Sequence, residues 1–241
     1  MLKRQHFCRF CGLADVRLQL PRLWHMSCFV SARLNVAFST RIVICVLWLL
    51  AAGAGAVVML NYEGGAGPAE GTPEHWPRTA GVALDPDRPT LIMFAHPRCP
   101  CTRASIEQLN RLLARCPRPV AAHVLFLKPH ELPETWAHST LWRSAAMISK
   151  LTVKEDDDGA EARRFGAATS GYVVLYDMRG NLLFRGGITA GRGHAGDNAG
   201  ADAIIALLRG RSTEMSQTPV YGCSLVNQCG TDLGDTSIWK K

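Results

Sequence analysis

The feature that most constrains this chain is an uncharged apolar run over residues 42–60, IVICVLWLLAAGAGAVVML. As a helix rising about 1.5 Å per residue, this run spans roughly 28 Å, which is close to the thickness of a bilayer's hydrocarbon core. A single run of this kind in 241 residues excludes a multi-span membrane protein. It predicts one transmembrane helix with chain on either side of the membrane.

Basic residues gather before the run. Residues 1–41 hold seven Lys and Arg against one acid, Asp15, whereas the other 200 residues carry 20 basic and 19 acidic side chains. By the positive-inside rule, the N-terminus is expected in the cytoplasm and the C-terminal part outside it. Because the bulk of the chain has almost no net charge, no nucleic-acid partner is expected despite the overall +7.

A cleaved signal peptide is the alternative to an anchor. The small residues over 52–56 (AGAGA) resemble a cleavage site. The apolar run continues through Leu60, however, and this favours an uncleaved transmembrane helix. Around it we expect five segments: a basic cytoplasmic tail 1–41, the transmembrane helix 42–60, a Gly/Pro-rich linker 61–84, a folded domain 85–210 and a C-terminal extension 211–241.

Hydrophobic periodicity predicts the secondary structure of the folded domain. The expected elements, in chain order, are a strand 90–95, a helix 102–115, a strand 120–127, a helix 138–151, a short helix 159–165, a hairpin of strands 172–177 and 181–185, and a last helix capped by Asp197 and running to 208. The early strand–helix–strand unit implies a parallel pair, and the hairpin adds an antiparallel edge.

Two thiols stand where the first strand meets the first helix, in Cys99-Pro100-Cys101. The N-terminus of a helix carries partial positive charge and free N–H groups, which favour thiolate over thiol. Arg98 and Arg103 flank the pair and act in the same direction. A thiolate at such a place is a nucleophile toward disulfides or a soft metal ligand.

These residues give the chain a resemblance to the thioredoxin-like (redoxin) superfamily. More narrowly, it resembles membrane-anchored bacterial redoxins of RedB type, through HPRCPCT (96–102), FGAATSGYVVLYD (165–177), GHAGDNAG (193–200) and PVYGCSL (219–225). The resemblance implies an α/β thioredoxin-like three-layer domain with a mixed central sheet, preceded by one transmembrane helix. It also implies a single-pass protein of the bacterial inner membrane with a periplasmic or extracellular domain.

The chain departs from the superfamily pattern in two ways. The cysteines are spaced CxC and not CxxC, so a disulfide between Cys99 and Cys101 would close a small, strained and therefore oxidising ring. Thioredoxins also place a cis-proline before the third strand, where this chain has Ser170-Gly171. The missing proline is expected to leave room beside the sulfurs that would suit a metal.

Five cysteines follow the membrane run, so at least one stays unpaired within the chain. Cys116 ends an apolar helical face and is expected in the core. Cys223 is expected either to resolve a mixed disulfide at Cys99 or Cys101, or to pair with Cys229 as a structural staple. Of the CPC pair, Cys99 is expected to be the more exposed and the more acidic thiol.

Three functions fit these residues. The first is a thiol–disulfide oxidoreductase in which Cys99 attacks a disulfide of a protein partner outside the cytoplasm and Cys101 or Cys223 resolves the intermediate. The second is a copper-binding redoxin, with Cys99, Cys101 and His96 as ligands. The third is a non-catalytic thioredoxin-like binding module. Apart from copper in the second case, no cofactor is expected.

Other motifs are interpreted as structural. The GxGxxG over residues 191–196 does not open a βαβ unit and is expected to be a flexible loop before the last helix. The acidic run 155–158 lacks the spacing of a calcium loop and is expected to be a solvated turn. Cys8 and Cys11 lack a second ligand pair for zinc. His123 is expected in the core or on the sheet surface.

Overall fold

The computed structural model describes residues 22–68 and 71–225, so that Cys8, Cys11 and Cys229 lie outside the described part. The chain divides into two compact units, Met1–Val58 and Met59–Lys241. The predicted apolar run lies in helix α1 (Arg22–Gly64). Its portion Ser39–Gly64, with a mean hydropathy of 2.6, is long and apolar enough to cross a membrane, a property that signal sequences share.

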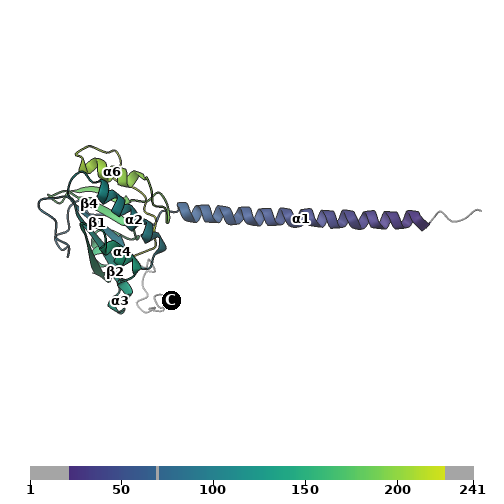
Figure 1. The fold of residues 1–241 in the computed structure, drawn as a ribbon, viewed down its shortest axis with the longest axis horizontal. Helices are drawn as coiled ribbons and strands as arrows, with labels where there is room; N and C mark the ends of the chain where they lie inside the picture. Colours follow the sequence, from purple (N-terminus) through teal and green to yellow (C-terminus); the bar gives the residue numbers. More distant parts are fainter. Residues whose placement is uncertain (1–21, 69–70, 226–241) are drawn as a thin grey trace, which may run out of the picture. The chain divides into compact units, whose positions relative to one another are not determined.

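The second unit is built on a five-stranded sheet in the order β3-β2-β1-β4-β5. Figure 1 labels the central neighbours β4, β1 and β2. The strands are β1 (Thr90–Ala95), β2 (Ala121–Lys128), β3 (Leu151–Asp157), β4 (Tyr172–Tyr176) and β5 (Leu182–Gly187). The first three are parallel, β4 runs antiparallel to β1, and β5 runs antiparallel to β4, so that β4 alone opposes the other four strands. This mixed sheet, entered by a strand–helix–strand unit and closed by a hairpin and a helix, is the predicted thioredoxin-like α/β fold, which is confirmed.

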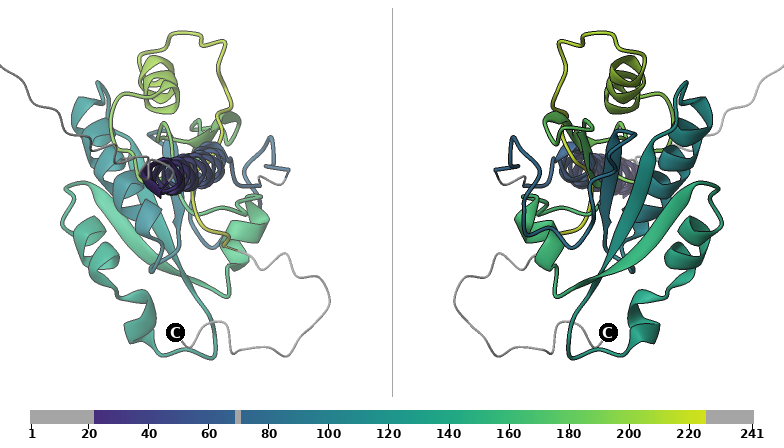
Figure 2. Two further views of the ribbon diagram at one scale, coloured as in Figure 1. Left: turned by 90° about the vertical axis from the view of Figure 1, so that its right-hand side faces the viewer. Right: turned by 90° about the vertical axis from the view of Figure 1, so that its left-hand side faces the viewer.

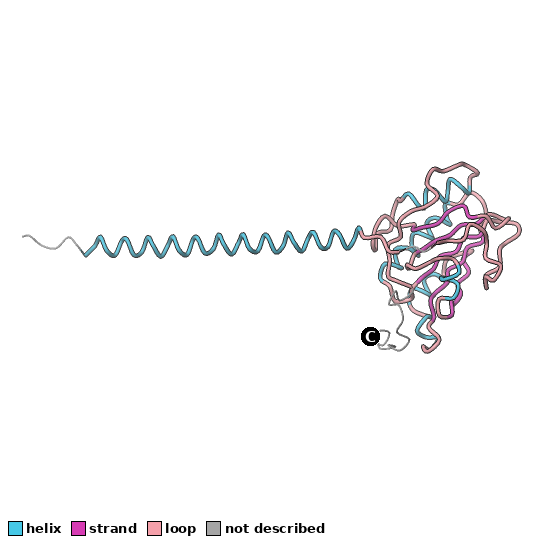
Figure 3. Tube along the Cα trace, turned by 180° about the vertical axis from the view of Figure 1, so that it is seen from behind, coloured by secondary structure: helices cyan, strands magenta, loops and turns pink. Residues whose placement is uncertain are grey.

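Two apolar clusters cover the two faces of the sheet, giving three layers (Figure 2). One face packs against α2 (Pro100–Arg115), α4 (Thr140–Ala146) and α6 (Ala199–Leu208). The other packs against α5 (Ala160–Arg164) and two irregular stretches, one before β1 and one after α6. In Figure 3 the loops and turns of the domain are drawn in pink beside the magenta strands. The short helix α3 (Glu134–Ala137) contacts β2.

The predicted linker 61–84 holds residues that pack against the sheet. Thr72 Oγ1 lies 2.5 Å from the hydroxyl oxygen of Tyr172. The Trp76 ring stands edge-on to Phe165 and Tyr176, with ring centroids 5.1 and 5.2 Å apart. The part of the segment that follows residue 71 therefore contributes to the second core cluster.

The predicted helix 138–151 is formed only in part, and the predicted solvated turn 155–158 is wrong. The first stretch ends early as α4, and residues of the second belong to β3, which pairs only with β2 and forms an edge of the sheet. An edge strand tolerates charged side chains. Asp156 is buried and accepts hydrogen bonds from the N–H groups of Glu161 and Ala162, at 2.7 and 2.9 Å, and so caps α5.

The predicted cap of the last helix is also wrong by one residue. Asn198 Oδ1 accepts the N–H of Ala201 at 2.8 Å, whereas the Asp197 side chain is 99% exposed. We therefore expect Asn198→Ala to lower the free energy of unfolding by about 1 kcal/mol, and Asp197→Ala to change it by less than about 0.5 kcal/mol. Urea unfolding of the two variants measures the difference, and equal effects would contradict the assignment.

Candidate active site

Cys99 sits where β1 gives way to α2. After β1, the backbone turns at His96-Pro97, and the N–H of Cys99 donates to the carbonyl oxygen of His96 at 3.2 Å. Cys99 is the N-cap residue of α2, with an extended backbone (φ −79°, ψ 122°), and Pro100 occupies the first turn of the helix. Proline suits this position because its fixed φ fits a helix and its missing N–H needs no partner. The Cys99 sulfur is thereby held at the positive end of the helix.

Cys223 and Thr102 surround the Cys99 sulfur with hydrogen-bond donors. Hydrogen bonding by the side chain and backbone of Cys223, and by those of Thr102, favours the ionised form of this sulfur and so lowers its pKa. Thr102 also donates its N–H to the carbonyl oxygen of Cys99 at 3.1 Å and its hydroxyl to that of His96 at 3.3 Å. The Cys223 thiol contributes most, and together these donors outweigh the effect of burial and lower the pKa of Cys99 to about 5. Hydrogen bonds to the charged form of a group favour that form. Cys99 is therefore a stabilised thiolate at neutral pH.

The other two thiols of the cluster are protonated partners. Burial, followed by the neighbouring charge on Cys99, raises the pKa of Cys101. The pKa of Cys223 is raised chiefly because its thiol donates to Cys99. The structure thus brings together Cys99, Cys101 and Cys223, the three residues predicted as catalytic, as free thiols around one negative charge.

The expected order of acidity within the CPC pair agrees with these pKa shifts, but the expected order of exposure is wrong. Cys99 is only 1% exposed and Cys101 is half-buried. The reason is the chain after α6, which folds back over the end of β1 and places Cys223 against Cys99. The source of the acidity also differs, because Arg98 packs over the ring of Trp136, at 5.3 Å from its centroid.

A network of buried hydroxyls replaces the missing cis-proline. Ser170 Oγ accepts the N–H of His96 at 2.9 Å and lies 2.7 Å from Thr102 Oγ1. Gly171 donates its N–H to Phe94 at 2.7 Å from a backbone with φ +89°, which favours glycine. This loop ties the end of β1 to the start of α2 and fixes the position of Thr102.

The room expected beside the sulfurs is filled by the chain itself. The N–H of Ser170 donates to the carbonyl oxygen of Cys223 at 2.8 Å. A Cβ atom added to Gly222 would lie 2.0 Å from the Ser170 oxygen, so the two backbones are in direct contact. Cys223 thus stands where the sequence suggested a vacancy for a metal.

The alternative copper site of Cys99, Cys101 and His96 is not formed. Among residues 22–68 and 71–225, no group of three or more His, Cys, Asp or Glu side chains could hold a metal ion. The Nδ1 atom of His96 accepts the N–H of Arg98 at 3.1 Å, and its ring stands edge-on to Trp136. Burial lowers the pKa of His96, so that it is neutral at pH 7. Cys116 is half-buried and packs against the first core cluster, as expected.

Arg192 belongs to the site but was not singled out in the sequence. Its guanidinium hydrogen-bonds Cys101 and favours the charged state of both Cys101 and Cys223. It also donates to the carbonyl oxygens of Gly222 at 2.7 Å and Gly65 at 3.2 Å. In the sequence, Arg192 stands out only as the arginine within the GxGxxG of residues 191–196, which was interpreted as a flexible loop before the last helix.

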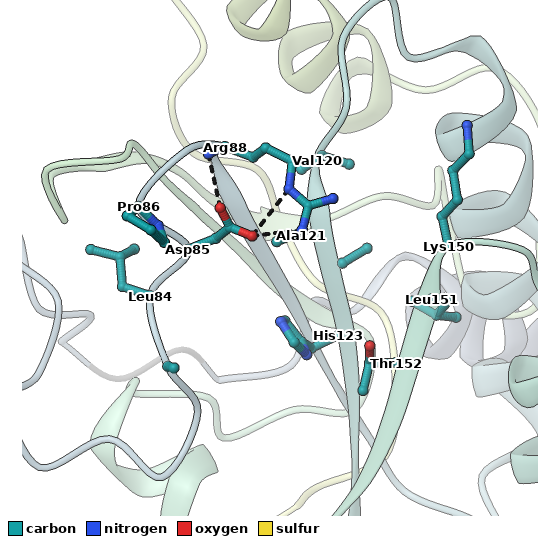
Figure 4. A pocket seen from close by; sticks show the side chains of 12 residues that line it. Leu84, Asp85, Pro86, Arg88, Val120, Ala121, His123, Lys150, Leu151 and Thr152 are labelled. Atoms are coloured by element: carbon teal, nitrogen blue, oxygen red, sulfur yellow. Dashed lines mark hydrogen bonds and ion pairs between the residues drawn. The ribbon is translucent and has the colours of Figure 1, made fainter.

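The hollow drawn in Figure 4 is separate from the thiols. It has a volume of about 570 Å³ and is lined by Asp85, Arg88, His123 and the first residues of β2 and β3. These are the amino ends of parallel strands, whereas Cys99 follows the carboxyl end of β1. The thiols thus have no part in lining this hollow.

No protein-family model matches the chain, and no curated protein matches it. Solved structures share its fold. An uncharacterized conserved protein from Geobacillus kaustophilus is 20% identical over 70% of this chain and 94% of that one, with a TM-score of 0.50. A secreted Mycobacterium tuberculosis disulfide oxidoreductase homologous to E. coli DsbE is 17% identical over 53% of this chain and 84% of that one, with a TM-score of 0.39.

A pneumococcal exposed lipoprotein thioredoxin from Streptococcus pneumoniae gives similar values, with 17% identity over 51% of this chain and 84% of that one and a TM-score of 0.38. Likenesses at such identities concern the fold and leave the narrower RedB-type resemblance a prediction. The strand order of the mixed sheet, with the thiols at the start of α2, gives the domain a thioredoxin-like α/β fold.

Proposed function

We propose that this protein is a membrane-anchored thiol–disulfide oxidoreductase with its redox centre at Cys99, Cys101 and Cys223. The observation that carries the proposal is the Cys99 thiolate, held by donors from Cys223 and Thr102 at the N-terminus of α2. A thiolate is both the nucleophile and the good leaving group of disulfide exchange. A purely structural cysteine has no need of such donors.

The proposed setting is the outer side of a bacterial inner membrane. Residues 42–60 would span the bilayer, the basic tail 1–41 would stay in the cytoplasm, and the thioredoxin-like domain would be periplasmic or extracellular. Disulfides persist in such oxidising compartments. The partners would be protein thiols or disulfides outside the cytoplasm.

Exchange activity of the full chain in detergent tests this proposal. We expect the protein to exchange with a disulfide-bonded reporter peptide, and Cys99→Ser to reduce the rate at least about 100-fold, because the serine hydroxyl is not ionised at neutral pH. Cys116→Ala, which removes a thiol outside the cluster, is the matched control and should retain the rate.

A wild-type rate no greater than that of the Cys99→Ser variant would overturn the proposal. In that case, stoichiometric copper binding by the reduced protein would favour the metal-binding alternative. The absence of both properties would favour a non-catalytic binding module.

A further inference from the structure

The chain after α6 forms a strap over the thiols, which we define as residues 216–225. At one end it runs alongside β5. There the N–H of Arg185 donates to the carbonyl oxygen of Ser216 at 3.0 Å, and the N–H of Thr218 donates to the carbonyl oxygen of Arg185 at 3.2 Å. At the other end, the N–H of Leu225 donates to Ala168 at 2.8 Å. In Figure 2 this is the yellow end of the colour scale, running beside the sheet.

Glycines make room for the strap along its length. A Cβ atom on Gly186 would lie 2.3 Å from the carbonyl oxygen of Thr218, and one on Gly187 would lie 2.5 Å from that of Pro219. Gly222 of the strap meets the Ser170 carbonyl in the same way. Val220 and Leu225 are buried in the second core cluster. The strap is therefore a packed part of the domain that holds Cys223 in a fixed place.

The strap brings one sulfur into contact with Cys99 from a distant part of the sequence. Cys223 is half-buried, whereas Cys99 is almost fully covered. Cys101 also hydrogen-bonds Cys99, but a bridge between residues two apart closes a small ring. A bridge to a distant residue has no such restriction.

We infer that the working disulfide joins Cys99 to Cys223, and that the half-buried Cys223 sulfur is the one that a substrate thiolate attacks. The inference rests on the proposed function and assigns the two sulfurs of its redox couple. Cys101 is then a positioning residue that donates a hydrogen bond to Cys99 and is not required to form the bridge.

The reaction balances as a transfer of two electrons from a substrate dithiol to the oxidised protein. A substrate thiolate attacks Cys223 Sγ, the Cys99–Cys223 bond breaks, and Cys99 leaves as the thiolate. The second substrate thiol loses its proton to solvent and attacks the substrate sulfur of the mixed disulfide. A substrate disulfide forms, and Cys223 departs and takes up a proton. The cluster is then in the reduced state that the structure shows, with Cys99, Cys101 and Cys223 as free cysteines.

Disulfide mapping in a glutathione series tests the inference on the full chain in detergent. The reduced protein is equilibrated with mixtures of reduced and oxidised glutathione, quenched in acid, alkylated, and digested for mass analysis. We expect a Cys99–Cys223 linked peptide in the wild type and in Cys101→Ser. In Cys223→Ser, exchange with the reporter peptide should fall at least tenfold, while Cys229→Ser should match the wild type.

The outcomes separate this inference from the proposed function. A Cys99–Cys101 or Cys223–Cys229 link in the wild type, with full exchange activity in Cys223→Ser, would overturn the Cys99–Cys223 couple and leave the oxidoreductase proposal standing. A wild type without exchange activity would overturn the proposed function, whichever peptides are linked. If Cys223→Ser unfolds, as judged by circular dichroism, the test rests on Cys101→Ser alone. Loss of the Cys99–Cys223 linked peptide in that variant, or loss of its exchange with the reporter peptide, would overturn the Cys99–Cys223 couple.

Discussion

The reduced protein is expected to hold one thiolate from about pH 5 upward, in a domain whose other thiols stay protonated at neutral pH. The pKa of Cys99 is lowered to about 5 by the Cys223 thiol and by Thr102, against an ordinary value of 9.0. Thiolate absorbance at 240 nm, followed from pH 3 to pH 8, should show one transition. The transition should vanish in Cys99→Ser and move to higher pH in Cys223→Ala, which loses the strongest donor.

The same shift makes the stability of the reduced protein depend on pH. Between about pH 5 and pH 9, unfolded Cys99 holds a proton that the folded state has released. Stability therefore rises with pH across this window, by at most about 1.4 kcal/mol per pH unit, and the contribution is lost as the pH falls through the folded pKa.

Urea unfolding of the reduced protein at several pH values measures this slope. Cys99→Ser is the reference, since it removes the titrating thiol of Cys99 and leaves all carboxylates and histidines in place. Wild-type and Cys99→Ser slopes that coincide from pH 5 to pH 8 would refute the stabilised thiolate.

A stabilised thiolate also changes the argument about redox potential. The sequence suggests an oxidising couple because a Cys99–Cys101 ring would be strained. The structure supplies a different cause: donors that stabilise the Cys99 thiolate favour the reduced protein over any disulfide that includes Cys99. Each tenfold stabilisation raises the potential by about 30 mV for a two-electron couple. An oxidising potential would then follow without strain.

The parts of the fold that were predicted correctly are those with a periodic pattern. The β1 strand is a short apolar run between prolines, and α2 repeats apolar residues at helical spacing, so the position of Cys99 between them followed from local sequence. The hairpin of β4 and β5 was visible for the same reason. The β3 strand was missed because its acidic residues suit an exposed turn as well as an edge strand.

The parts of the site that were missed depend on contacts between distant segments. The strap has no periodic pattern, and its contacts with Ser170 and β5 rely on backbone groups and on the absence of side chains at glycines. Nothing in the local sequence shows that Gly222 lies against Ser170, or that Arg192 points to Gly222. The sequence offered Cys223 either as a resolving thiol for Cys99 or Cys101 or as the partner of Cys229, and gave no contact that decides between the two.

Gly222→Ala is expected to separate the strap from the thiols while leaving all three cysteines in the chain. The new Cβ atom would lie 2.0 Å from the Ser170 carbonyl oxygen and 2.9 Å from its carbon, both of which are backbone atoms. A backbone cannot rotate away as a side chain does, so the strap must shift. Overpacking of this kind costs about 1–3 kcal/mol. Cys223 would lose its contact with Cys99.

The expected result is a rise of at least about one unit in the pKa of Cys99, because its strongest donor retreats. We also expect at least about a tenfold loss of the Cys99–Cys223 disulfide at a fixed glutathione ratio, which corresponds to about 1.4 kcal/mol. Gly71→Ala is the matched control, since no atom lies within 4 Å of its Cβ position. Should Gly222→Ala keep both the wild-type titration and the wild-type disulfide yield, the strap would not position Cys223, and the acidity of Cys99 would have to come from α2 and Thr102 alone.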